Sequence, residues 1–100
     1  METFDLTSAA CEDLYRIWEY TFDTWSEAPA DKYYASLKEA FLDIASSPLS
    51  TGKPYDSLYL GLRGYHVGRH IVFYLIRDNG RVLIVRILHE KMDYGQHLNG

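Results

Sequence analysis

The chain has 100 residues, of which 47% are hydrophobic and 24% charged, with a formal net charge of −4. This size predicts one domain, residues 1–100, and the composition excludes a disordered or collagen-like chain. The longest apolar run, Ile71 to Ile76, is too short to cross a bilayer, and the N-terminus lacks the pattern of a signal peptide. The single cysteine, Cys11, excludes an internal disulfide and a cysteine-based zinc site, so we expect a cytoplasmic protein with no membrane contact.

The N-terminal half predicts a short strand followed by two helices. Residues 3–6 form a candidate strand, and Thr7-Ser8 is typical of a helix N-cap. Apolar residues then recur at helical spacing until Ser26–Pro29, which marks the start of a second helix. This helix is expected to end near Ser46-Ser47, because Pro48 disfavours helical geometry in the residue before it. The short connection predicts an antiparallel helical hairpin.

The first helix carries an apolar face that is wider than one helix contact requires. Two adjacent stripes consist of Ala10, Leu14, Ile17 and Thr21, and of Cys11, Tyr15, Trp18, Phe22 and Trp25. Aromatic residues at this spacing are most often core residues. The other interpretation is that some of them form a surface for a partner, because Tyr and Trp are common binding anchors.

The C-terminal half predicts a loop and then strands. Residues 48–57 are rich in Pro, Gly, Ser and Thr and indicate a loop. The candidate strands span residues 60–67, 70–77 and 81–89. Gly68-Arg69 and Asp78-Asn79-Gly80 between them are typical of hairpin turns. The last two strands are apolar on both faces, so one face needs the helices and the other a tail, a subunit or a partner. The fold class expected is α+β, with a short N-terminal strand and a helical hairpin packed on a twisted antiparallel sheet.

Two segments of the C-terminal third show a family resemblance. Gly64 to Tyr74 reads Gly-Tyr-His-Val-Gly-Arg-His-Ile-Val-Phe-Tyr, and Val85 to Asp93 reads Val-Arg-Ile-Leu-His-Glu-Lys-Met-Asp. They resemble the ParE branch of the RelE/ParE toxin superfamily. In the first helix Asp13-Leu14, Ile17-Trp18 and Trp25 look like the same family, and the similarity runs in order along nearly the whole chain.

The resemblance implies the toxin of a type II toxin–antitoxin pair, neutralised by a small ParD-like antitoxin encoded beside it. ParE-like toxins typically poison DNA gyrase and are not nucleases. The resemblance therefore implies a binding protein with no cofactor, no metal and no catalytic residues. No sequence-specific binding to nucleic acid is expected.

The expected antitoxin contacts are aromatic and apolar side chains of the two helices, which would receive an amphipathic helix. They are Leu14, Tyr15, Trp18, Tyr33, Tyr34 and Leu37. Residues 1–50 hold three basic and ten acidic residues, a balance of −7, whereas residues 51–100 hold seven basic and four acidic residues, a balance of +3. The expected target contacts are the basic side chains of the second half, namely Arg63, Arg69, Arg81, Arg86 and Lys91. Plain solvation of these charges is the alternative, and for Arg86 an ion pair with Glu90 or Asp93.

The RelE branch offers a rival chemistry, cleavage of mRNA on the ribosome. Here it would need His70, Arg86 and His89 together on one exposed face, where they would activate a hydroxyl and stabilise a transferring phosphate. His89 also fits a structural role, hydrogen-bonded to the turn that follows it. His66 and His70 flank a turn, so their spacing does not predict a metal site. A third hypothesis is a toxin fold without toxicity that serves only in autoregulation.

Overall fold

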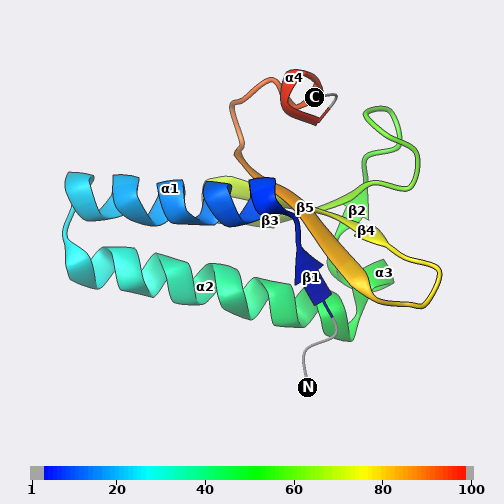
Figure 1. Cartoon of the computed structure of the whole chain (residues 1–100), viewed down its shortest axis with the longest axis horizontal. Helices are drawn as coiled ribbons and strands as arrows, with labels where there is room; N and C mark the ends of the chain where they lie inside the picture. Colours follow the sequence, from blue (N-terminus) through cyan, green and yellow to red (C-terminus); the bar gives the residue numbers. More distant parts are fainter. Residues whose placement is uncertain (1–3, 99–100) are drawn as a thin grey trace.

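The computed structural model describes residues 4–98, in which two long helices cover one face of a five-stranded sheet (Figure 1). Helices α1 (Ser8–Thr24) and α2 (Glu27–Ser46) form the hairpin. The strands are β1 (Phe4–Leu6), β2 (Lys53–Pro54), β3 (Arg63–Val67), β4 (His70–Ile76) and β5 (Val82–His89). Two short helices, α3 (Pro48–Thr51) and α4 (Tyr94–Leu98), complete the chain. The predicted α+β fold with a helical hairpin on a sheet is confirmed.

The sheet is mixed, whereas a purely antiparallel sheet was expected. Its order is β1-β5-β4-β3-β2, and Phe4 of β1 pairs with Val82 in parallel orientation. The chain passes from β1 into two helices before it enters the rest of the sheet, and only a direct hairpin requires antiparallel pairing. The other strand pairs are antiparallel.

Local signals place the ends of most elements. Thr7 caps α1, since its Oγ1 accepts a hydrogen bond of 3.0 Å from the amide of Ala10. The two predicted hairpin turns contain Gly68 and Gly80 at φ values of 57° and 83°, a region that glycine enters without strain. The predicted loop at residues 48–57 is more ordered than expected, because it contains α3 and the edge strand β2.

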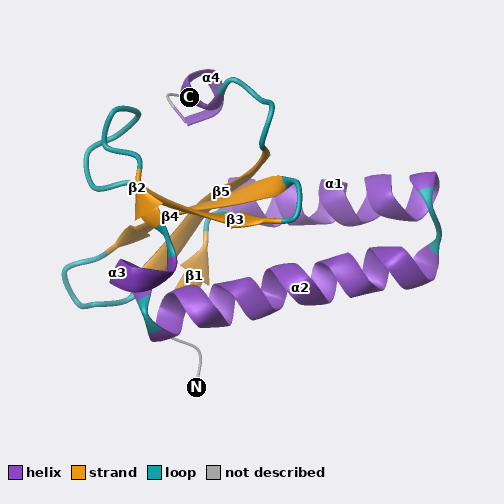
Figure 2. Ribbon diagram, turned by 180° about the vertical axis from the view of Figure 1, so that it is seen from behind, coloured by secondary structure: helices purple, strands orange, loops and turns teal. Residues whose placement is uncertain are grey.

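The sheet is buried on both faces by the chain itself. On the helix side, Leu37, Phe41 and Ile44 of α2 pack against Val72 and Ile84. The second face carries Leu62, Ile71, Phe73 and Leu88, and it is covered by Tyr55 and Leu58 of the loop before β3 and by Tyr94 and Leu98 of the tail. Figure 2 shows this loop and α4 on the same side of the sheet, away from α2. A tail, a subunit or a partner was expected on the second face, and the structure shows the tail there together with the loop before β3.

Tyr74 of β4 joins the sheet to the segment that follows α2. Its side chain is fully buried, and its hydroxyl donates to the carbonyl of Pro48 at 2.6 Å and accepts from the amide of Gly52 at 3.1 Å. We expect Tyr74→Phe to lower the free energy of unfolding by about 1–3 kcal/mol, because it leaves buried polar groups without partners. Urea unfolding measures this, and Tyr59→Phe, at an exposed tyrosine, is the control. Equal stabilities of the two variants would contradict the assigned role.

Candidate functional site

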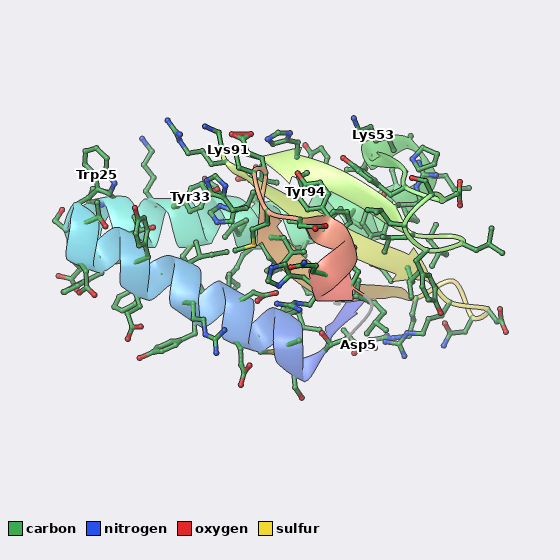
Figure 3. The ribbon with its side chains drawn as sticks, turned by 90° about the horizontal axis from the view of Figure 1, so that it is seen from above. Asp5, Trp25, Tyr33, Lys53, Lys91 and Tyr94 are labelled. Carbon is green, nitrogen blue, oxygen red and sulfur yellow. The ribbon has the colours of Figure 1, made fainter. Side chains whose placement is uncertain are left out.

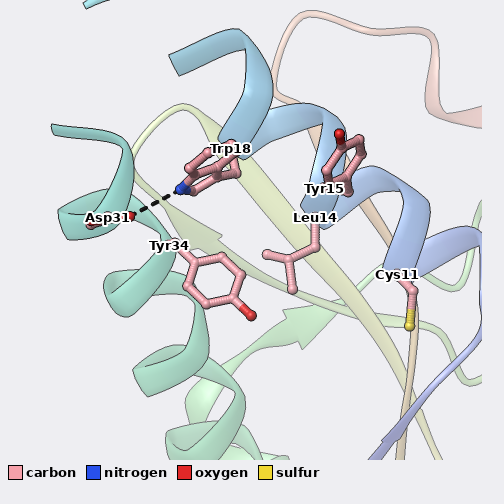
Figure 4. Close-up of a pocket in the computed structure, with 6 residues that line it drawn as sticks. All are labelled: Cys11, Leu14, Tyr15, Trp18, Asp31 and Tyr34. Atoms are coloured by element: carbon pink, nitrogen blue, oxygen red, sulfur yellow. Dashed lines mark hydrogen bonds between the residues drawn. The ribbon is translucent and has the colours of Figure 1, made fainter. Parts of the chain in front are cut away.

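A groove runs between the two long helices. It is lined by Cys11, Leu14, Tyr15 and Trp18 of α1 and by Asp31 and Tyr34 of α2, with a volume of about 450 Å³ (Figure 4). The indole N–H of Trp18 donates to Oδ1 of Asp31 at 3.1 Å and so connects the two helices. Tyr15 stays 61% exposed. The groove thus offers a mainly apolar surface with aromatic walls to a partner.

The two apolar stripes of α1 separate in the structure. Ala10, Leu14 and Ile17 pack against the helix-side core. The second stripe turns outward, and Trp25 at the far end of the hairpin is 73% exposed (Figure 3). Trp18 and Phe22 stack with their ring centroids 5.1 Å apart. The aromatic stripe of α1 therefore lies outside the buried core, and its use as a surface for a partner stays a prediction.

The structure brings together four of the six expected antitoxin contacts. Leu14, Tyr15, Trp18 and Tyr34 line the groove. Leu37 was wrongly included, because it is fully buried in the core and has no surface for a partner. The remaining residue, Tyr33, does not line the groove, and its hydroxyl donates to the carbonyl of Val67 at 3.0 Å.

The groove also contains two residues that were not among the predicted antitoxin contacts, Cys11 and Asp31. Cys11 lies three and four positions before Leu14 and Tyr15, and Asp31 three before Tyr34. Helical spacing places such residues on one face. That signal was sufficient to find them.

Arg86 forms an ion pair with Asp13 of α1, rather than with Glu90 or Asp93. The carboxylate of Asp13 accepts from Nε of Arg86 at 2.7 Å and from Nη2 at 2.9 Å, and it also accepts from the amide of Ile87 at 2.9 Å. This hydrogen-bonded carboxylate raises the pKa of the guanidinium. Asp13 is 7% exposed. Arg86 therefore has a structural role, in contrast to the predicted target contact.

Two further arginines of the predicted basic surface also bind their own chain. Nη2 of Arg63 donates to the carbonyls of Leu49 at 2.8 Å and Gly52 at 2.7 Å. Arg81 forms an ion pair with Asp5 at 3.0 Å, and its hydrogen bond holds the pKa of that carboxyl below the ordinary value. The two arginines bind at opposite edges of the sheet, since Asp5 belongs to the edge strand β1 and Lys53, the residue after Gly52, belongs to the other edge strand, β2 (Figure 3).

The other two members of that set, Arg69 and Lys91, are exposed. The amide of Glu90 donates to the carbonyl of Arg69 at 2.9 Å, so the backbones of the β3–β4 turn and the end of β5 lie together. The predicted basic surface is thus reduced to these two side chains.

The three residues considered for RNA cleavage do not converge. His70 pairs with His89 in the β4–β5 ladder, whereas Arg86 pairs with Phe73. Because alternate residues of a strand point to opposite faces, Arg86 lies on the other face from the two histidines. Nδ1 of His89 accepts from the amide of Lys91 at 3.1 Å, in agreement with its structural interpretation.

His70 predicts a dependence of stability on acid. Burial, and to a lesser extent His89, lower the pKa of His70 to about 4 in the folded chain. The unfolded chain takes up this proton below the ordinary histidine pKa of about 6.5, whereas the folded chain takes it up only near pH 4. The free energy of unfolding is therefore highest above pH 6.5 and decreases as the pH falls to about 4. We expect a loss of about 2 kcal/mol over this window, discounted for partial exposure of the ring.

The measurement is urea unfolding from pH 7 to pH 4. The ring is in contact with the hydroxyl of Tyr33, 2.8 Å from Nδ1, and with the ring of His89, while the charges of Glu90 and Asp13 act to raise the pKa of His70. In His70→Gln the loss between pH 6.5 and pH 4 should become smaller. An unchanged slope would assign the acid sensitivity to another group.

Within residues 4–98 no group of three or more His, Cys, Asp or Glu side chains is arranged to hold a metal ion. The helices of the same part are too short or too polar to cross a membrane.

Solved structures with this arrangement define the class of protein. A chain of the chromosomal ParDE toxin–antitoxin system from P. aeruginosa superimposes with a TM-score of 0.76, at 17% identity, over 89% of this chain and 96% of that one. A chain of the toxin–antitoxin complex RelBE2 from Mycobacterium tuberculosis gives a TM-score of 0.67, at 26% identity, over 88% and 96%. The fold is therefore that of the small toxins of toxin–antitoxin systems.

Sequence relatives define the family. The sequence model described as ParE toxin of type II toxin-antitoxin system, parDE, matches residues 4–94. Toxin ParE1 of Caulobacter vibrioides is 36% identical over 98% of this chain and 99% of its own length. Toxin ParE1 of M. tuberculosis is 33% identical over 93% and 94%, and Toxin ParE of Escherichia coli is 34% identical over 93% and 89%. The chain belongs to the ParE toxin family and is a ParE-type toxin of a toxin–antitoxin system.

Proposed function

We propose that this toxin inhibits DNA gyrase in the cytoplasm by binding it, and that a ParD-like antitoxin neutralises it. The observation that supports the antitoxin part is the α1–α2 groove. Tyr15, Trp18 and Tyr34 line it, and Tyr15 and Tyr34 stay 61% and 37% exposed. Exposed tyrosine and tryptophan rings in a groove suit the anchors of a binding partner. Membership of the ParE family supports the gyrase part.

The groove suits an amphipathic helix of the antitoxin. Such a helix places anchors at i, i+3 and i+4 into an apolar groove, and aromatic walls provide much of the binding energy. Asp31 lies in the groove, and residues 1–50 carry a balance of −7. We therefore expect basic residues beside the apolar anchors of the antitoxin helix.

Binding accounts for inhibition better than RNA cleavage does. Cleavage needs a cation close to an acid or base at the reacting phosphate. Here the guanidinium of Arg86 is held by Asp13, and it lies on the opposite face from His70 and His89. Because the chain also resembles a chain of the RelBE2 complex, the test below includes RNA cleavage as a second outcome.

The experiment combines purified gyrase, supercoiled plasmid, ATP and antitoxin-free toxin. The proposal predicts linear DNA that accumulates with toxin dose and disappears when antitoxin is added. Translating ribosomes form the second arm, in which mRNA should stay intact. Cleaved mRNA with unaffected gyrase would overturn the proposal, and normal growth on induction without antitoxin would indicate a fold that has lost its toxicity.

A further inference from the structure

The loop between β2 and β3 projects an apolar tip from the sheet face opposite the helical hairpin. Leu60 at its end is 85% exposed and Tyr59 beside it 56%. Figures 1 and 2 show the loop and α4 extending to the same side, away from α2. We call residues 56–61 the finger.

The finger is ordered by its own hydrogen bonds. Oδ1 of Asp56 accepts from the amide of Gly61 at 2.9 Å, and the carbonyl of Tyr55 accepts from the amides of Leu58 at 3.0 Å and Tyr59 at 3.3 Å. Gly61 has a φ of 84°, which only glycine adopts without strain. A single exposed leucine is ordinary, but an apolar tip held in one conformation loses little entropy when it binds.

A hollow adjoins the finger. It has a volume of about 270 Å³, and Tyr59 forms one of its walls. Leu62, Leu75 and Val85 also line it, together with Leu98 of α4, and the polar residues of its lining include Arg86 and His97. A projecting leucine beside an apolar hollow forms a surface that can both insert a side chain and receive one.

The charge at the base of the finger is positive. The ammonium of Lys53 lies 5.6 Å from the ring centroid of Tyr55, the residue that precedes the finger. Residues 53–63 hold two cations, Lys53 and Arg63, against one carboxylate, Asp56, which is a local balance of +1. The guanidinium of Arg63 binds carbonyl oxygens and a hydroxyl, so no carboxylate compensates its charge. Electrostatic complementarity therefore favours a partner that has carboxylates for these cations around an apolar hollow for the tip of the finger.

From these features we infer that the finger and its hollow are the surface by which the toxin engages its target protein, through an apolar hollow rimmed by carboxylates on that protein. The inference rests on the proposed function, inhibition by binding. It replaces most of the predicted basic surface, because Arg63, Arg81 and Arg86 bind their own chain. The antitoxin groove lies between the helices, so the two partners use different faces.

The test compares Leu60→Asp with Leu49→Asp, a matched change at a leucine of α3 that is 74% exposed. In the gyrase cleavage assay we expect Leu60→Asp to need at least about tenfold more toxin than the wild type, since burial of a charge replaces burial of an apolar side chain. Leu49→Asp should act like the wild type. Thermal unfolding and antitoxin affinity should be unchanged in both variants. Equal potency of wild type and Leu60→Asp would overturn the inference.

Growth arrest on induction separates this inference from the gyrase proposal. If wild-type toxin does not act on gyrase, the proposed target is wrong, and the growth assay then decides the role of the finger. Growth restored by Leu60→Asp and not by Leu49→Asp supports the inference, whereas arrest by both variants overturns it. A wild-type dimer in light scattering that Leu60→Asp dissociates would also overturn it, by assigning the finger to a second copy of the chain.

Discussion

Asp13→Ala is expected to lower the free energy of unfolding by about 3–5 kcal/mol, the range for removal of one partner from a buried ion pair. The Asp13 side chain is 8% exposed and that of Arg86 22%. Without the carboxylate, the guanidinium and the amide of Ile87 lose the acceptor that they share. The same contact joins the first half of α1 to β5, in addition to the apolar packing of the two helices on the sheet. Urea unfolding measures the loss.

Neighbouring and paired changes make this prediction specific. Glu12→Ala removes an adjacent carboxylate that reaches Arg16 only at 4.0 Å on an exposed helix face, and it should cost less than about 1 kcal/mol. The double variant Asp13→Leu with Arg86→Met should be more stable than Asp13→Ala, because it leaves no unpaired charge. A cost for Asp13→Ala as small as that for Glu12→Ala would show that the ion pair is unimportant.

Tyr15→Asp is expected to weaken antitoxin binding by about 2 kcal/mol, which is about 30-fold in Kd. The substitution removes an aromatic wall of the groove and places a charge where the antitoxin helix would be apolar. Because Tyr15 is 61% exposed, the fold should be preserved. Isothermal titration of toxin with antitoxin measures the change.

The matched control is Tyr20→Asp. Tyr20 is also a tyrosine of α1, it is 69% exposed, and it does not line the groove. Its substitution should leave the affinity within about twofold of the wild type, a difference of about 0.4 kcal/mol. Equal losses for the two variants would mean that the antitoxin covers α1 as a whole and not the groove.

Signals close together in the sequence predicted most of the fold. The cap at Thr7, the turns at Gly68 and Gly80, and the end of α2 before Pro48 each depend on a few neighbouring residues. The parallel pairing of Phe4 with Val82 has no such signal, because strand orientation across a helical crossover is decided by tertiary packing.

The candidate site was predicted only in part for the same reason. Helical spacing found Tyr15 and Trp18, but it could not show that Leu37 faces the core, since both faces of α2 contain apolar residues. Asp13 and Arg86 are 73 positions apart, and only the fold brings them together. The basic surface was predicted wrongly for most of its residues. The direction in which each arginine points depends on the strand register, and composition does not reveal the register.

We propose that the antitoxin binds the groove and the target binds the opposite face, and one titration tests this division. Tyr15→Asp toxin is mixed with gyrase and plasmid, and antitoxin is added in steps beside a wild-type series. We expect the variant to cause gyrase to cleave DNA as strongly as the wild type does, and to need about 30-fold more antitoxin for suppression. A variant that no longer acts on gyrase, or that the antitoxin suppresses as easily as the wild type, would contradict it.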